Sequence, residues 1–257
     1  MSPFDVDDLR MDLILRGDIG AFRTTYRDTL YPELEDMSST ELWDDLASYE
    51  LVPDFRIRRL STAANSVPAH AKVLDIGVGW GEIIPMLEKR GVSDYVGIDF
   101  SEAVVTEVSK KYPDCRFQVG TIDEVTGFFD VVLALEVCEH ILASKILDFY
   151  ESVLSVLNDN GKFILSVPIY EDLEAQTLRC PHCNHMHNKM GHVRSYTPEL
   201  IRAELEIAGF VVTSTAFIFS RFANTISGRS KRYFANIGKW LLGMSKTIPL
   251  NIVITAE

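Results

Sequence analysis

The chain has few cysteines, only four in 257 residues, and it contains no internal repeat and no low-complexity tract. No apolar run is long enough to span a bilayer. The first residues carry neither the basic nor the apolar region of a signal peptide. These absences argue against a disulfide-stabilised secreted domain, a repeat array and an integral membrane protein. They predict a cytoplasmic protein in a reducing compartment, without a transmembrane segment.

Acidic residues are absent between Ile207 and Ile254, although the whole chain has a formal net charge of −12. Generic nucleic-acid binding is unfavourable for so acidic a protein, because its surface repels phosphate backbones. Residues 230–246 carry apolar side chains at helical spacing with basic residues between them. This pattern is compatible with peripheral contact to an anionic membrane, or with an ordinary amphipathic helix docked on the domain.

Short apolar segments alternate with segments of helical periodicity from residue 71 onward. This alternation predicts an α/β protein with a Rossmann-like, seven-stranded, mostly parallel sheet and helices on both faces. We expect strands at 72–76, 95–98, 115–119, 128–135, 162–167, 210–219 and 250–256. Residues 1–70 are predicted to form an N-terminal helical extension or lid. Residues 71–257 are predicted to form the main domain, with a Cys/His-rich insertion at 169–196 after strand five and a basic helical insertion at 221–248.

A glycine-rich segment, Asp75-Ile76-Gly77-Val78-Gly79-Trp80-Gly81, follows the first expected strand and leads into a helix. Glycines adopt positive φ and let a ligand approach the backbone. Asp99 ends the next strand, where an acid can accept both hydroxyls of a ribose. An NAD site and a turn that only packs helix on strand are the alternatives. The Gly-x-Gly-x-Gly spacing and Asp75, which would repel a pyrophosphate but can pair with an ammonium, argue against NAD.

Five segments in order resemble the motifs of class I S-adenosylmethionine-dependent methyltransferases: residues 73–81, 96–101, 120–123, 129–140 and 161–168. The resemblance implies that Asp75 and Gly77 hold the methionine end of the cofactor, Asp99 the ribose, and Ile122 with Asp123 the adenine. Thr121 departs from the pattern, since many relatives carry an acid there. The cofactor-binding residues that this resemblance implies are Asp75, Gly77, Gly79, Gly81, Asp99, Phe100, Ile122, Asp123 and Glu136.

The segment Glu136-x-x-Glu139-His140 falls at the end of strand four, beside the expected position of the reactive methyl. Two carboxylates and an imidazole can bind a divalent metal such as Mg²⁺. The pattern resembles the metal site of ubiquinone-pathway and small-RNA 3′-end O-methyltransferases, which add a later histidine that His192 would supply. The alternatives are a helix-start capping device, and His140 or His192 as a metal-free general base. Glu136, Glu139, His140 and His192 are thus the catalytic candidates.

A second group of metal-ligand residues lies in the insertion. Cys180, Cys183, His187 and His192 have a spacing that can hold zinc, and His185 can replace either histidine. The alternative is a surface loop with free thiols, and the two metal hypotheses compete for His192. Tyr170, Arg194 and Tyr196 are candidates for contact with an acceptor; packing or a solvated face is the alternative for each.

The resulting prediction is an enzyme that transfers a methyl group from S-adenosylmethionine to an oxygen of a small-molecule, sugar or lipid-linked acceptor. A non-catalytic cofactor-binding or scaffold protein of the same fold is the alternative. An NAD-dependent oxidoreductase is a third hypothesis.

Overall fold

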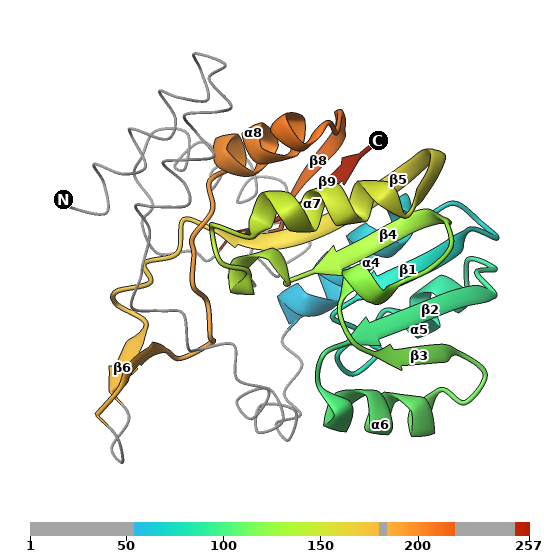
Figure 1. Cartoon of the computed structure of the whole chain (residues 1–257), viewed down its shortest axis with the longest axis horizontal. Helices are drawn as coiled ribbons and strands as arrows, with labels where there is room; N and C mark the ends of the chain where they lie inside the picture. Colours follow the sequence, from blue (N-terminus) through green and yellow to red (C-terminus); the bar gives the residue numbers. More distant parts are fainter. Residues whose placement is uncertain (1–53, 180–183, 219–249) are drawn as a thin grey trace, which may run out of the picture.

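The computed structural model describes residues 54–179, 184–218 and 250–257. Seven strands form one sheet in the order β3-β2-β1-β4-β5-β9-β8 (Figure 1). Strands β1 (Lys72–Ile76), β2 (Asp94–Asp99), β3 (Arg116–Val119), β4 (Phe129–Leu135) and β5 (Leu157–Ile169) pair in parallel. β9 (Leu250–Ala256) is antiparallel to both β5 and β8 (Val212–Ile218). The predicted fold class, a mostly parallel Rossmann-like sheet, is confirmed.

The predicted strands differ from the observed ones mainly at their ends. β1 and β9 have the expected bounds, whereas β5 begins at Leu157 and ends at Ile169 instead of covering 162–167. Its first residues, Asn158 to Asn160, are polar and exposed, so they carry no apolar signal. Leu157 nevertheless pairs with Phe129 of β4, and the register of the two strands shifts before the next pair, Val131 with Lys162.

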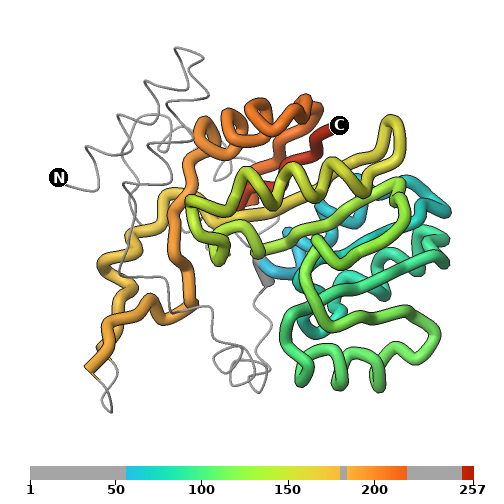
Figure 2. The backbone as a smooth tube through the Cα atoms, viewed as in Figure 1, coloured from blue at the N-terminus to red at the C-terminus, as the bar shows by residue number. Residues whose placement is uncertain are grey.

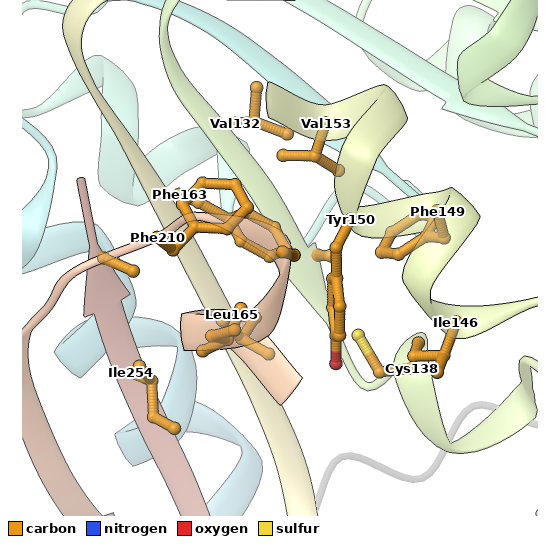
Figure 3. Packing of buried hydrophobic residues seen from close by; sticks show 14 of the residues in the cluster. Val132, Cys138, Ile146, Phe149, Tyr150, Val153, Phe163, Leu165, Phe210 and Ile254 are labelled. Atoms are coloured by element: carbon orange, nitrogen blue, oxygen red, sulfur yellow. The ribbon is translucent and has the colours of Figure 1, made fainter. Parts of the chain in front are cut away.

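Helices cover both faces of the sheet, and each face has its own hydrophobic core. α7 (Ile146–Ser155) and α8 (Pro198–Ala208) pack on one face, where Tyr150, Phe163 and Phe210 are fully buried neighbours (Figure 3). α4 (Asp54–Ser66), α5 (Ile84–Glu88) and α6 (Glu102–Lys111) pack on the other face. α4 precedes the predicted boundary at residue 70, yet its side chains belong to this second core. The boundary itself stays a prediction.

Local signals explain where two of the helices begin and end. Ser101 accepts a hydrogen bond from the amide of Val104 at the start of α6, and Thr197 does the same for Leu200 at the start of α8. α8 ends at Gly209, whose φ is 103°.

The insertion after β5 leaves the sheet on the side to which the parallel strands point, as Figures 1 and 2 show. It contains a two-stranded antiparallel hairpin of β6 (Thr177–Arg179) and β7 (Met186–Asn188), which the sequence did not predict. In the part of the chain that the structure describes, no helix is long and apolar enough to cross a membrane.

Candidate functional site

The glycine loop begins where β1 meets its two neighbours. Ile76, the last residue of β1, is aligned with Ile98 of β2 and Ala134 of β4. Gly77, Gly79 and Gly81 all have positive φ, between 49° and 69°. A Cβ at Gly81 would clash with three side chains of the core, whereas one at Gly79 would meet nothing closer than 4.0 Å. Gly79 therefore faces open space, as a backbone that approaches a ligand should.

Asp99 ties the glycine loop to the end of β2. Its Oδ2 accepts a hydrogen bond from the Gly79 amide at 3.2 Å, and its Oδ1 accepts one from the Ser101 amide at 3.0 Å. Each carboxylate oxygen has two lone pairs, and each of these bonds uses one of them. The arrangement suits the predicted role of Asp99 as the ribose ligand, which stays a prediction.

Asp75 lies below the loop, buried, with its Oδ2 accepting a 2.6 Å hydrogen bond from the Tyr95 hydroxyl. Burial raises the pKa of this carboxyl to about 7, and the charge of Asp99 adds to the shift, while the Tyr95 bond opposes it. The predicted ion pair with a cofactor ammonium would restore the charge of Asp75 at neutral pH. Tyr95 is a partner that the sequence did not predict.

The proposed adenine side lies next to Asp99, because the Gly120 amide donates to the Asp99 carbonyl at 2.9 Å. Ile122 is buried in the 3-10 helix η1 (Ile122–Glu124). Asp123 is exposed, and its Oδ1 accepts a 2.7 Å hydrogen bond from Ser152 of α7. Phe100, directly after Asp99, is 41% exposed. These positions are compatible with the predicted cofactor contacts, which stay predictions.

Glu136 follows β4 in a left-handed conformation, with φ at 60°. Its carboxylate accepts hydrogen bonds from Ser166 of β5 at 2.8 Å and from Asn251 of β9 at 2.6 Å. It also forms an ion pair with Arg59 of α4 at 2.8 Å. The carboxylate of Glu136 is thus held by three side chains from three other elements.

Glu139, His140 and His192 come together instead, with their ligand atoms within 4.8 Å of one another. Glu139 and His140 lie on the 3-10 helix η2 (Cys138–His140), and His192 comes from the insertion. Two bonds fasten the insertion to η2: the Val193 amide donates to the Glu139 carbonyl at 2.9 Å, and His140 bonds the Gly191 carbonyl. His192, more than fifty positions along the chain, is thereby placed beside Glu139 and His140.

The hydrogen bonds of the two imidazoles define their tautomers. His140 Nδ1 lies 3.0 Å from the Gly191 carbonyl oxygen, which can only accept, so Nδ1 carries the proton. His192 Nδ1 lies 2.6 Å from Glu171 Oε2, so the same holds there when the imidazole is neutral. The lone pair of each ring is then on Nε2, and His192 Nε2 is 4.0 Å from Glu139 Oε1. Carboxylate or carbonyl support of this kind is typical of metal-binding histidines.

The electrostatics of this cluster are unusual for a protein interior. Glu139 is fully buried, and among the described residues neither carboxylate oxygen has a hydrogen-bond partner. Burial, with the nearby charge of Glu136, raises the pKa of Glu139 well above its usual range. Burial and the neighbouring His192 lower the pKa of His140 to about 3, so its imidazole is neutral at physiological pH. A buried carboxyl group without a hydrogen-bond partner, next to a neutral imidazole, is an arrangement that a divalent cation would satisfy.

Other sequence-predicted residues lie elsewhere. Cys180 and Cys183 of the zinc hypothesis, and the basic stretch 230–246, fall outside the described residues. His187 is on β7, while His192 belongs to the Glu139 cluster.

For Arg194 and Tyr196 the structure favours the packing alternative, because both side chains are buried in the core. Arg194 pairs with the fully buried Glu204 of α8, and the Tyr196 hydroxyl donates to the Cys138 carbonyl at 3.3 Å. Tyr170 is 48% exposed at the start of the insertion.

Comparison with known proteins identifies the family. A family model described as "Methyltransferase domain" matches residues 49–215. The chain therefore belongs to the methyltransferase domain family, and it is an S-adenosylmethionine-dependent methyltransferase. A search of curated proteins gave no significant match.

Solved structures similar to this chain share its fold at low sequence identity. The N-methyltransferase NodS from Bradyrhizobium japonicum, in complex with S-adenosyl-L-homocysteine, is 11% identical with a TM-score of 0.57, over 84% of this chain and 96% of that one. An S-adenosylmethionine-dependent methyltransferase from Mesorhizobium loti is 16% identical with a TM-score of 0.53, over 79% and 97%. The methyltransferase CcbJ from Streptomyces caelestis is 14% identical with a TM-score of 0.56, over 85% and 95%.

Proposed function

We propose that the protein methylates an oxygen of a small-molecule, sugar or lipid-linked acceptor, and that Glu139, His140 and His192 hold a divalent metal at the acceptor side of the site. The observation that carries this proposal is the buried Glu139 carboxyl group, which has no hydrogen-bond partner among the described residues and lies beside the imidazoles of His140 and His192. A bound cation would lower the pKa of an acceptor hydroxyl and so favour its attack on the methyl group.

The position of this cluster relative to the glycine loop supports the proposal. A Cβ built on Gly77 would lie 2.8 Å from Val137 Cγ2, so the turn between β4 and η2 packs directly against the loop. The cluster starts two residues after Val137. An acceptor bound at the cluster would therefore lie beside a cofactor bound at the loop, and alignment with exclusion of water can supply much of the rate.

The low pKa of His140 argues against one form of the metal-free alternative, in which His140 is the general base. A general base works best when its pKa is near the operating pH. With a pKa of about 3, His140 is too weak a base to take a hydroxyl proton efficiently, whereas a neutral imidazole is the form that binds metals. His192, held by Glu171 through Nδ1, would present Nε2 to the same cation.

The test uses 3,4-dihydroxybenzoate as a probe acceptor, because its two neighbouring hydroxyls can bind one cation. Methyl transfer from radiolabelled S-adenosylmethionine should fall at least tenfold after chelation and return with Mg²⁺ or Mn²⁺. Glu139→Gln should abolish the response to added metal, whereas Glu171→Asp, which keeps the carboxylate, should retain it. Turnover that is indifferent to chelation would refute the metal.

A further inference from the structure

Glu136 is a member of the metal set that the sequence pattern predicts, but its carboxylate points to other partners. Ser166, Asn251 and Arg59 all bind it, at 2.6 to 2.8 Å. Its amide also donates to the Ser166 carbonyl at 2.9 Å. Among the described residues, the group of potential ligand atoms contains Glu139, His140 and His192 and leaves Glu136 out.

The backbone of Glu136 indicates why this residue is tied so firmly. A φ of 60° is strained for a glutamate, and such strain persists only when the surrounding structure holds it. The residue joins the end of β4 to η2, which carries Glu139 and His140. The direction in which the chain leaves β4 therefore depends on the contacts of Glu136.

Arg59 is the charged partner that the sequence did not predict. Its side chain is 8% exposed and belongs to α4, which packs on the sheet from the opposite face to α7 and α8. One turn earlier, Arg56 of the same helix pairs with Glu82, directly after the glycine loop, at 2.5 Å. α4 is thus fastened at two points, one beside the cofactor loop and one beside the acceptor turn.

We propose that Arg59 and Glu136 form a positioning pair that holds the turn between β4 and η2, so that Glu136 orients the metal ligands and is not itself a ligand. This proposal rests on the proposed metal site but assigns it three protein ligands, two imidazoles and one carboxylate. Such a set leaves coordination positions open for the two hydroxyls of an acceptor. The Arg56–Glu82 pair has no such role, because it contacts the cofactor loop.

Co²⁺ binding to the purified full chain, followed by its visible absorption, separates a ligand from a positioning residue. Glu139→Gln should abolish binding. Glu136→Gln and Arg59→Met should keep one ion with an unchanged band position, but weaken its affinity about tenfold to a hundredfold, as loss of a supporting residue does. Arg59→Lys, which keeps the charge, should recover most of the affinity. Arg56→Met, the matched control on the same helix, should bind Co²⁺ like the wild type.

Each single variant leaves one charge without its ionic partner, the buried Arg59 or the half-buried Glu136, which can destabilise the fold. The double variant Arg59→Met with Glu136→Gln removes both charges and provides a folded comparison, checked by circular dichroism. It should be no weaker in Co²⁺ binding than the weaker single variant, because the two residues act as one unit. Additive losses would overturn the pairing.

A measurement on the metal-free protein tests the positioning pair independently of the proposed metal site. In the metal-free protein, the imidazole NMR signals of His140 should shift in Arg59→Met and stay unchanged in Arg56→Met, since only the first loosens η2. If wild-type protein binds no Co²⁺, the metal hypothesis fails while this shift still tests the positioning pair. A changed Co²⁺ band in Glu136→Gln, or an unshifted His140 signal in Arg59→Met, would overturn the inference.

Discussion

Replacing Glu139 with methionine should stabilise the metal-free protein. The side chain is fully buried, and neither carboxylate oxygen has a hydrogen-bond partner among the described residues. A buried polar group without a partner costs about 1–3 kcal/mol. Methionine has a similar length and no oxygen to desolvate, so Glu139→Met should raise the free energy of unfolding by about that amount. For a chain of this size the melting temperature should rise by about 2–12 °C.

Thermal unfolding in a chelating buffer, followed by circular dichroism, measures this effect. Glu204 is the matched control, because it is equally buried but paired with Arg194 and bonded by Tyr150. Removing one partner of a buried ion pair costs about 3–5 kcal/mol, so Glu204→Met should be destabilised. Added Mn²⁺ at about a hundred times its dissociation constant should stabilise the wild type by about 2.7 kcal/mol and leave Glu139→Met unchanged. A metal-free Glu139→Met protein that melts below the wild type would refute the reasoning.

Two further predictions concern the cofactor loop. Burial raises the pKa of Asp75 to about 7, so the folded protein keeps a proton that the unfolded chain loses near pH 4. The free energy of unfolding should therefore fall as the pH rises from about 4 to about 7. Urea titrations at several pH values should show this decline in the wild type and not in Asp75→Asn. Gly79→Ala should weaken S-adenosylhomocysteine binding with only a small loss of stability, about 1–2 kcal/mol from its positive φ. Gly81→Ala should mainly lower the melting temperature, because its Cβ would lie 2.7 Å from Tyr112. Equal losses of stability in the two variants would contradict this interpretation of the loop.

The sheet was predictable because its signal is local. Buried parallel strands are apolar on both faces, and glycine, proline and capping residues mark where the elements change. Seven strands in the right places follow from that pattern. The β6–β7 hairpin was missed because Thr177–Arg179 and Met186–Asn188 are too short and too polar to show strand periodicity.

The candidate site was predictable only in part. The sequence pattern predicted that His192 lies with Glu139 and His140, and the structure places these three side chains together. The sequence pattern could not show that the Glu136 side chain points away from these three residues. That orientation depends on a left-handed backbone and on Arg59 and Asn251, which are distant in sequence. The orientation of a side chain such as that of Glu136 is set by tertiary contacts, which a single sequence does not reveal. The packing of Arg194 and Tyr196 also depends on tertiary contacts, since Glu204 and Cys138 supply their partners inside the core.

Calorimetric titration of the protein with S-adenosylhomocysteine tests the central claim, that the glycine loop and Asp99 bind the methyl donor. We expect one ligand per chain for the wild type. Asp99→Ala should weaken binding at least tenfold, because two ribose hydroxyls lose a charged acceptor. Asp123→Ala, an exposed acid bonded to Ser152, should have a smaller effect. Absence of binding to the folded wild-type protein at millimolar ligand would contradict the account.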